Sequence, residues 1–113
     1  MTAIIGASST PQQATACTAV FVAHELGIPD GLASCFDVNA TCLSFLVAFD
    51  VAARIAAAGA LRHVLVFSSE SVSHSMNPDA PESAVHFGDA AAAMIVSHAG
   101  DTGSALHGTR LQT

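Results

Sequence analysis

A long apolar segment, residues 43–58, constrains this chain more than any other feature, and it follows a short strand-like run at residues 36–39. Its large apolar side chains, such as Phe45 and Ile55, are spread over every face of a helix, which is typical of a helix enclosed in the interior of a fold. Gly59 follows as the expected C-terminal cap. A helix of this kind needs further layers of structure on all sides.

Strands and helices alternate along the chain, which is typical of an α/β fold built on a mainly parallel sheet. The run at residues 64–67 is continuously β-branched and aromatic, as expected of a parallel strand covered on both faces. A late antiparallel element is expected near the end of the chain. The predicted elements are a strand at 3–6, a helix at 15–26, a strand at 36–39, the helix at 43–58, a strand at 64–67, a polar loop at 68–81, and a hairpin of 90–97 and 104–110 around a turn at 100–103.

Composition excludes several classes of function. With 51% hydrophobic and 11% charged residues, the chain is unusually apolar for a soluble domain of 113 residues, so we expect something else to cover part of its surface. A formal net charge of −6, with no lysine, argues against nucleic acid or anionic lipid as a partner. No apolar run reaches the roughly 18 residues of a membrane span, because Asp50 and Arg54, which can pair with each other, interrupt the longest one.

The three cysteines lack the spacing of a disulfide framework or a zinc site. Cysteines of this kind suit a reducing compartment, and we therefore expect a cytoplasmic protein. No pair of histidines has metal-ligand spacing together with a carboxylate. The sequence thus predicts neither a metal nor a cofactor.

Cys42 is the candidate nucleophile. It lies between the strand at 36–39 and the helix at 43–58, where unpaired backbone N–H groups and the helix dipole favour a thiolate. The small residues Ala40 and Thr41 allow a sharp turn before the thiol, which is the geometry that presents a nucleophile at a helix start. The alternative is that Cys42 is a buried small hydrophobe, as most cysteines in apolar surroundings are.

Two blocks of sequence carry a resemblance to a known family. Residues 36–42 read FDVNATC and residues 87–93 read FGDAAAA, and their order and spacing are more specific than either block alone. With the apolar helix between them, they resemble the N-terminal half of β-ketoacyl-acyl-carrier-protein synthase III, a condensing enzyme of the thiolase superfamily. The resemblance implies a five-layered α/β/α/β/α fold of two similar halves, in which the cysteine starts a central buried helix. Residues 1–113 would then form a partial N-terminal, thiolase-like domain that lacks the family's N-terminal section and its C-terminal half.

The same resemblance implies acyltransferase chemistry at Cys42. In the family the thiolate takes an acyl group from a thioester, usually acyl-CoA, and the acyl-enzyme condenses with the carbanion of a decarboxylating malonyl-acyl-carrier protein, in fatty acid or polyketide-type synthesis. The backbone N–H of Cys42 would be the first donor to the tetrahedral oxyanion. Phe87 and Val72 fall where the family lines its acyl channel, and ordinary core packing is the alternative reading for both. Family members are dimers, so we expect a homodimer.

Departures from the family pattern keep other functions open. No motif here matches the family's catalytic histidine and asparagine, and Pro81 stands where some members have an arginine near the nucleotide of CoA. The alternative is a catalytically incomplete fragment, or an interaction module, that retains the thiolase-like half-fold. A third hypothesis, a cysteine hydrolase, needs a histidine base near Cys42, and His86 is the candidate among the six histidines.

Overall fold

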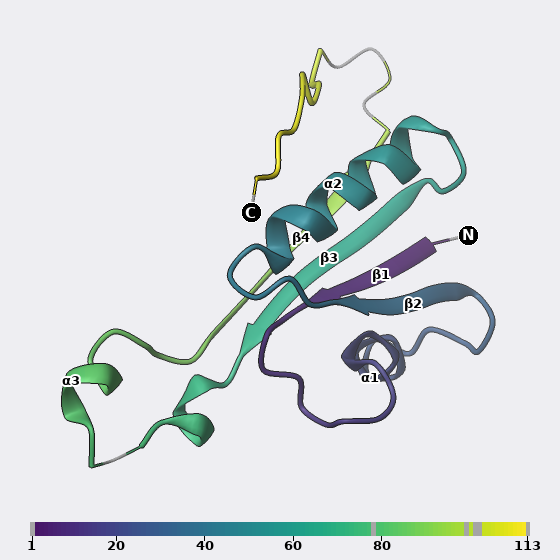
Figure 1. Cartoon of the computed structure of the whole chain (residues 1–113). Helices are drawn as coiled ribbons and strands as arrows, with labels where there is room; N and C mark the ends of the chain where they lie inside the picture. Colours follow the sequence, from purple (N-terminus) through teal and green to yellow (C-terminus); the bar gives the residue numbers. More distant parts are fainter. Residues whose placement is uncertain (1, 78, 99, 101–102, 113) are drawn as a thin grey trace.

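A four-stranded sheet with one helix packed on each face forms the centre of the fold (Figure 1). The computed structural model describes residues 2–77, 79–98, 100 and 103–112. Pro78 of the predicted loop, and Asp101 and Thr102 of the predicted turn, lie outside the described residues. In chain order the elements are β1 (Thr2–Ala7), α1 (Thr18–Glu25), β2 (Ala33–Val38), α2 (Ser44–Ala57), β3 (His63–Glu70), the 3₁₀-helix η1 (Val72–Ser75), α3 (Pro81–Ala84) and β4 (Ala90–Ser97).

The strands lie in the order β2-β1-β3-β4, with the first three parallel and β4 antiparallel to β3. This order confirms the predicted α/β architecture with a mainly parallel sheet and a late antiparallel strand. Apolar runs form β1 and β3 because both faces of these strands are covered. Their largest fully buried side chains are Ile4, Ile5, Val64 and Val66.

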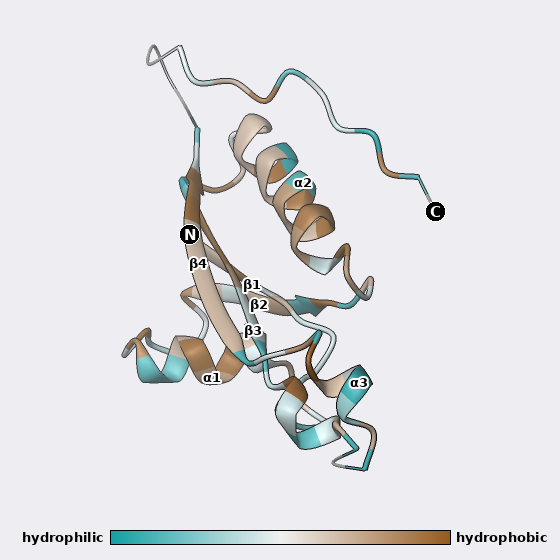
Figure 2. Cartoon of the chain, turned by 90° about the vertical axis from the view of Figure 1, so that its left-hand side faces the viewer, coloured by the Kyte–Doolittle hydropathy of each residue, from teal (hydrophilic) through white to brown (hydrophobic). Residues whose placement is uncertain are grey.

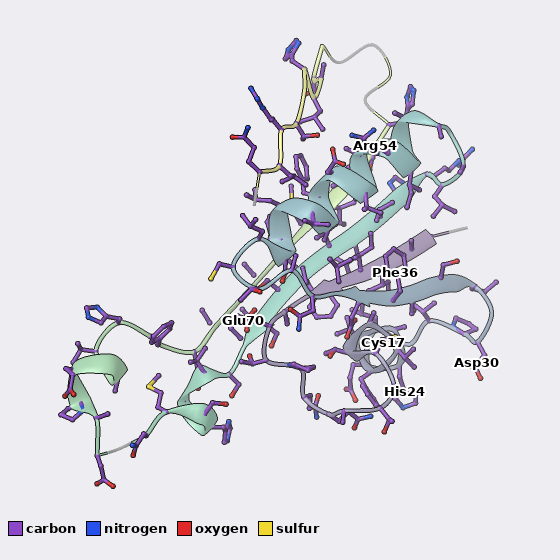
Figure 3. All side chains as sticks on the ribbon, in the orientation of Figure 1. Cys17, His24, Asp30, Phe36, Arg54 and Glu70 are labelled. Carbon is purple, nitrogen blue, oxygen red and sulfur yellow. The ribbon has the colours of Figure 1, made fainter. Side chains whose placement is uncertain are left out.

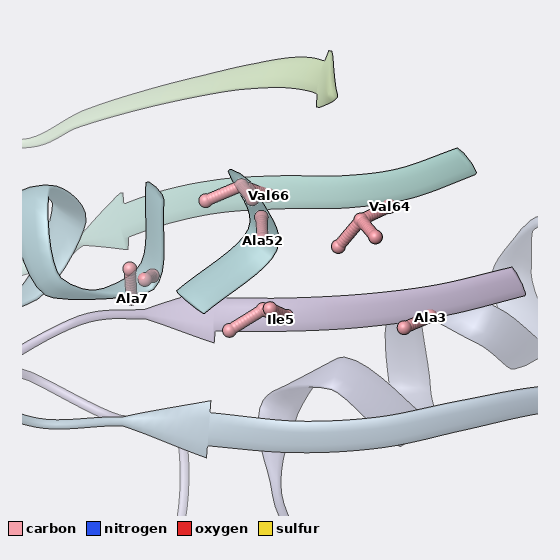
Figure 4. Close-up of a cluster of buried hydrophobic side chains, with 7 residues drawn as sticks. Ala3, Ile5, Ala7, Ala52, Val64 and Val66 are labelled. Carbon is pink, nitrogen blue, oxygen red and sulfur yellow. The ribbon is translucent and has the colours of Figure 1, made fainter. Parts of the chain in front are cut away.

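Alternate side chains of the strands face the two helices, which lie on opposite sides of the sheet (Figure 2). On one face β1 and β3 pack against α2, and Figure 4 shows this cluster. On the other face β1 and β3 pack against α1. The first cluster consists of Ala3, Ile5, Ala7, Ala48, Ala52, Val64 and Val66, and the second of Ile4, Ala19 and Phe67.

The predicted apolar helix forms as α2, and Gly59 follows it with a left-handed φ of 68°, as expected of a cap. Small residues on its inner face allow a close approach to the sheet. Its outer face is covered only in part, since the segment after β4 lies over Asp50 and Arg54 while Leu46 is 52% exposed. Within this chain the helix is therefore buried on one face rather than on every face. No helix in the described ranges is long and apolar enough to cross a membrane. The buried positions of α2 are Ser44, Ala48, Ala52 and Ala56.

The prediction that a second strand completes a terminal hairpin is wrong. β4 occupies Ala90–Ser97, as predicted, but the described residues 103–112 contain no strand. β4 pairs instead with β3, from His63 opposite Ser97 to Glu70 opposite Ala90. The edge of β3 is available along its whole length, whereas the segment after β4 contains Gly108 and few residues that favour strands.

Three other element boundaries differ from the prediction by three residues each. The last three residues of β3, predicted as loop, continue the strand because they pair with β4. β2 begins at Ala33, three residues earlier than predicted, in register with β1. α1 begins at Thr18 rather than at residue 15, because Ala16 has a φ of 63°, which is incompatible with a right-handed helix.

Asp37 connects β2 to the start of α1. Its Oδ2 accepts a hydrogen bond from the N–H of Thr18 at 2.6 Å, and its Oδ1 accepts one from the N–H of Ala19 at 3.0 Å. These donors would otherwise lack partners in the first helical turn, where negative charge is also favoured by the dipole. Gly6, opposite Asp37 in the sheet, leaves room for the carboxylate, since a Cβ at that position would lie 2.3 Å from Oδ1. The aspartate of the FDV block is therefore a capping residue.

Candidate active site

Cys42 lies in the segment that joins β2 to α2. This segment lies at the carboxyl ends of the parallel strands (Figure 1). This end of an α/β sheet is a common location for ligand sites. The side chain of Cys42 is exposed, so it is not a buried packing residue in this chain. α2 begins at Ser44, with Leu43 in the N-cap position. The position therefore fits an accessible nucleophile close to a helix start.

The turn before Cys42 is sharp, as the small residues predict. Thr41 has a φ of 54°, a left-handed conformation that is rare for a β-branched residue. Conformations of this kind persist where the surrounding structure holds them. Asn39 contributes, because its Oδ1 accepts a hydrogen bond from the N–H of Thr41 at 3.1 Å. The N–H of Leu43 donates to the carbonyl of Ala40 at 3.1 Å and closes the turn.

Ser44 holds the same turn from the helix side. Its side chain is polar but only 2% exposed. Its Oγ accepts a hydrogen bond from the N–H of Ala40 at 2.9 Å and donates one to the carbonyl of Thr41 at 2.6 Å. Ser44 was not among the residues predicted from the sequence. The available signal was a polar residue four positions before Ala48, on the stripe of alanines that faces the sheet.

Glu70, at the end of β3, fastens the loop after β1 (Figure 3). Its carboxylate accepts hydrogen bonds from the backbone N–H groups of Ser9 and Thr10, at 2.8 and 3.1 Å, and from both hydroxyls. Burial raises the pKa of Glu70, but the hydrogen bonds from Thr10 and Ser9 outweigh burial and bring the pKa below its ordinary value. Glu70 is therefore an ionised structural anchor at neutral pH.

The aspartate of the FGD block has a similar structural role. Asp89 accepts hydrogen bonds from the hydroxyl of Ser73 at 2.5 Å and from its backbone N–H at 2.8 Å. These bonds lower the pKa of Asp89, and His74 contributes further in the same direction. The segment that precedes β4 is thus tied to η1.

Phe87 and Val72, the candidate channel residues, both lie in the segment between β3 and β4. Val72 is the first residue of η1 and is half-buried, whereas Phe87 precedes β4 and is 60% exposed. η1 and α3 extend away from the sheet (Figure 1), and in the described part of the chain neither packs against α2. Core packing is therefore the wrong reading for Phe87 here. An acyl channel at these residues would need further structure to cover them.

Two cavities open on the surface of the described part of the chain. One opens between the outer face of α2 and the segment after β4, and the Asp50–Arg54 ion pair lines part of it. This predicted pair is confirmed, with 2.7 Å between Arg54 Nε and Asp50 Oδ2, and the hydrogen bond from Arg54 lowers the pKa of Asp50. The other cavity lies between the loop after β1 and the segment after β3, and most of the residues that line it are serine or threonine. Neither cavity is lined by Cys42, Phe87 or Val72.

No histidine in the described ranges forms a hydrogen bond with Cys42. His86, the candidate base, is exposed beside Phe87. His74 pairs through Nδ1 with the hydroxyl of Ser71 at 2.8 Å. Among the described residues, no group of three or more His, Cys, Asp or Glu side chains is placed to hold a metal ion. Within the part of the chain that the structure describes, the thiol of Cys42 is therefore accessible but has no histidine bonded to it.

The other two cysteines are packing residues. Cys17 and Cys35 are half-buried and pack against the cluster beneath α1. Figure 3 labels Cys17 beside this helix. Cys17 was predicted within the helix but occupies the position that precedes it. Burial raises the pKa of the Cys35 thiol, and the nearby Cys17 and Asp37 raise it further. Cys35 is therefore poorly suited to act as a nucleophile.

These features define a class: a thiolase-like α/β fold with a cysteine on a strained turn between a parallel strand and the helix that follows. The family model for 3-oxoacyl-(acyl-carrier-protein) synthase III matches residues 36–113, which include Cys42 and both sequence blocks. The chain therefore belongs to this family.

Individual relatives and structures agree with the family model. The chain is 40% identical over 94 residues to a beta-ketoacyl-(acyl-carrier-protein) synthase III of Sphingopyxis alaskensis, a match that covers 83% of the chain and 29% of the relative. It is 36% identical over 104 residues to a beta-ketoacyl-(acyl-carrier-protein) synthase III of Streptomyces coelicolor, covering 90% of the chain and 30% of the relative. The crystal structure of the Aquifex aeolicus 3-oxoacyl-(acyl-carrier-protein) synthase III superposes with a TM-score of 0.80 at 32% identity, over 88% of the chain and 32% of that structure.

The match covers only part of each relative. The chain spans about 30% of the length of the curated relatives it matches. The superposition nonetheless confirms the predicted thiolase-like α/β fold for the part that is present.

Proposed function

We propose that this chain carries the acyl-accepting cysteine of a condensing acyltransferase of the synthase III type. Cys42 takes an acyl group from a thioester such as acyl-CoA, and the acyl-enzyme condenses with a malonyl thioester on acyl-carrier protein, in fatty acid or polyketide-type synthesis. The observation that carries the proposal is the exposed Cys42 on a strained turn, inside the region that matches the family.

Acyl transfer begins when the sulfur of Cys42 attacks the thioester carbonyl. A new S–C bond forms, the bond to the carrier sulfur breaks, and the carrier leaves as a thiol with the proton that the Cys42 thiol has lost. The tetrahedral intermediate carries negative charge on oxygen, and in this proposal the backbone N–H of Cys42 donates a hydrogen bond to it. The acyl group then remains on Cys42 as a thioester.

Condensation needs groups beyond the turn that holds Cys42. Loss of carbon dioxide from the malonyl thioester leaves a carbanion, which attacks the acyl carbonyl and releases the Cys42 thiolate. In the described part of the chain no histidine bonds to Cys42. We therefore assign the groups that stabilise the carbanion to another segment of the protein or to a partner chain.

In this proposal residues 1–113 form part of an N-terminal, thiolase-like domain, and Phe87 and Val72 line its acyl channel. Phe87 is 60% exposed and Val85 is 76% exposed, so apolar side chains reach solvent on both sides of His86. Exposed apolar side chains close together are typical of a surface that another segment or a ligand covers.

Uptake of an acyl group by Cys42 tests the proposal. We expect acyl-CoA substrates to add an acyl mass to the peptide that contains Cys42, and Cys42→Ala to abolish this addition. Cys35→Ala is the matched control and should retain it, because burial raises the pKa of that thiol. A chain that takes up no acyl group, or takes it up at Cys17 or Cys35, contradicts the assignment.

A second candidate function is a catalytically incomplete fragment or interaction module. It is favoured by the observation that, within the described residues, no histidine bonds to Cys42. Addition of a malonyl thioester to the acylated chain tests whether this chain alone can complete the condensation. We expect no ketoacyl product from this chain alone, and measurable product would show that condensation needs fewer groups than proposed.

We further propose a homodimer in the cytoplasm. Leu46 and Ile95 are 52% and 68% exposed, and at about 25 cal/mol per Å² a few hundred Å² of such surface costs several kcal/mol. The three free cysteines suit a reducing compartment. Sedimentation at several concentrations, with a dye that binds apolar surface, should show self-association. A compact monomer that binds no dye would contradict this part of the proposal.

A further inference from the structure

We propose that Ser44 is a positioning residue for Cys42: it fixes the peptide plane whose N–H donates to the oxyanion during acyl transfer. The inference rests on the proposed function of Cys42, and it adds a residue that has no reactivity of its own in the reaction.

The carbonyl of Thr41 is held by two donors from Ser44. The hydroxyl of Ser44 donates to it at 2.6 Å, and the backbone N–H of Ser44 donates to it at 3.1 Å. This carbonyl and the N–H of Cys42 belong to the same peptide unit, which is planar and trans. In a trans peptide the C=O and N–H bonds point in opposite directions. By holding the carbonyl at two points, Ser44 therefore sets the direction of the Cys42 N–H.

The hydroxyl of Ser44 also holds the other side of the turn. It accepts a hydrogen bond from the N–H of Ala40 at 2.9 Å, so one oxygen connects the peptide that precedes Ala40 with the peptide that follows Thr41. The strained φ of 54° at Thr41 lies between these two points. The peptide unit between Ala40 and Thr41 is held by other groups. Its N–H donates to Oδ1 of Asn39, and its carbonyl accepts a hydrogen bond from the N–H of Leu43.

Burial makes this arrangement sensitive to the loss of one atom. Ser44 is 2% exposed, so water is poorly placed to replace its hydroxyl. Without that hydroxyl the N–H of Ala40 loses its partner and the carbonyl of Thr41 keeps one of two donors. A carbonyl that accepts fewer hydrogen bonds also leaves the N–H of the same peptide a weaker donor.

Two reactions of the same sulfur separate positioning from general stability. Alkylation of Cys42 by iodoacetamide forms no oxyanion, whereas acyl transfer from a thioester does. If Ser44 orients the oxyanion donor, its loss should slow the second reaction and leave the first nearly unchanged. A role in stability alone would change both rates together, or neither.

The test compares both rates at Cys42 in the full 113-residue chain. Ser44→Ala should lower the rate of acyl transfer from acyl-CoA about tenfold and change the iodoacetamide rate by less than about twofold. Ser44→Thr, which keeps a hydroxyl, should restore acyl transfer. Ala48→Gly, one turn further along the same buried face, is the matched control, because it weakens the helix without touching the turn. Ser44→Gly is measured in parallel, since it removes the hydroxyl without leaving a methyl group in its place.

An equal fall of both rates, or no fall in acyl transfer, in a folded variant that lacks the hydroxyl would overturn the inference and leave the proposed function intact. A tenfold fall in Ala48→Gly would also overturn it. If the wild-type chain is alkylated at Cys42 but accepts no acyl group, the proposed function fails, and the inference fails with it.

Discussion

The two sequence blocks of the family match differ in how tightly this chain packs them. In the first block, Asp37 lies against Gly6 and caps α1, and a Cβ on Gly6 would lie 2.3 Å from its carboxylate. In the second block, Phe87 is 60% exposed, and a Cβ on Gly88 would meet nothing within 4 Å. Both blocks use an aspartate to hold a neighbouring helix, but only the first is part of the core. The chain thus builds the support of Cys42 by itself and leaves the proposed channel wall open.

The largest effect is expected at Gly6. Gly6→Ala places a methyl group 2.3 Å from Asp37 Oδ1 and 3.0 Å from Phe67 Cζ, so the strand or the carboxylate must move. Overpacking and a weakened helix cap together should lower the free energy of unfolding by about 3 kcal/mol. Urea unfolding followed by circular dichroism measures this change.

Gly88→Ala is the matched control for the second block and should change the free energy of unfolding by less than about 0.5 kcal/mol. If the two substitutions have similar effects, the contrast in packing between the blocks is wrong.

The two aspartates should also differ. Asp37→Ala removes both hydrogen bonds to the first turn of α1 and should cost about 1 to 2 kcal/mol of unfolding free energy. Asp89→Ala should have a smaller effect, confined to η1, and hydrogen exchange at the amide of Ser73 should rise. Equal losses of global stability would mean that η1 is more closely integrated with the core than its position indicates.

A pH dependence should appear at Glu70. Its pKa in the folded protein lies below the ordinary value of 4.5, so the stability that its carboxylate contributes is present above that value and is lost as the pH falls through the folded pKa. Glu70→Gln should therefore lower the free energy of unfolding by about 1 kcal/mol at neutral pH. In acid the free energies of unfolding of the variant and the wild type should become more similar. Urea unfolding across this pH range measures the difference. Glu25→Gln, at an exposed position on α1, is the control and should show no such trend.

The smallest effect on stability is expected at Phe87. Because its ring is largely exposed, Phe87→Ala should change the free energy of unfolding by less than about 0.5 kcal/mol. In the proposed function it should nevertheless slow acyl transfer of longer chains more than of short ones. A stability loss of several kcal/mol would instead show that Phe87 belongs to the core.

The strands and helices were predictable where apolar runs are long, as in β1, β3 and α2. The partner of β4 was not, because the turn signal at residues 100–103 indicates where a strand ends but not which edge accepts it. Which strand pairs with the open edge of β3 depends on the tertiary structure, because β1 already occupies the other edge. Likewise, hydrophobicity alone does not show which faces of α2 find a partner within this chain.

The turn before Cys42 was partly predictable. The small residues before Cys42 indicated a sharp change of direction, and Thr41 adopts a left-handed φ. The hydrogen bonds that hold this turn were not predicted, because a serine near a helix start is usually an exposed cap. Only the burial of Ser44 against the sheet, which depends on how α2 packs, distinguishes it from such a cap.

The contact between Gly6 and Asp37 implies an order in which substitutions can accumulate. Any side chain at position 6 meets the carboxylate at position 37 first, so a change at position 6 is tolerated only after position 37 has become smaller. The reverse order passes through an overpacked intermediate. The two positions, distant in sequence but opposite each other in the sheet, should therefore show strong epistasis, and a combined library should recover alanine at position 6 only together with a shortened residue at position 37.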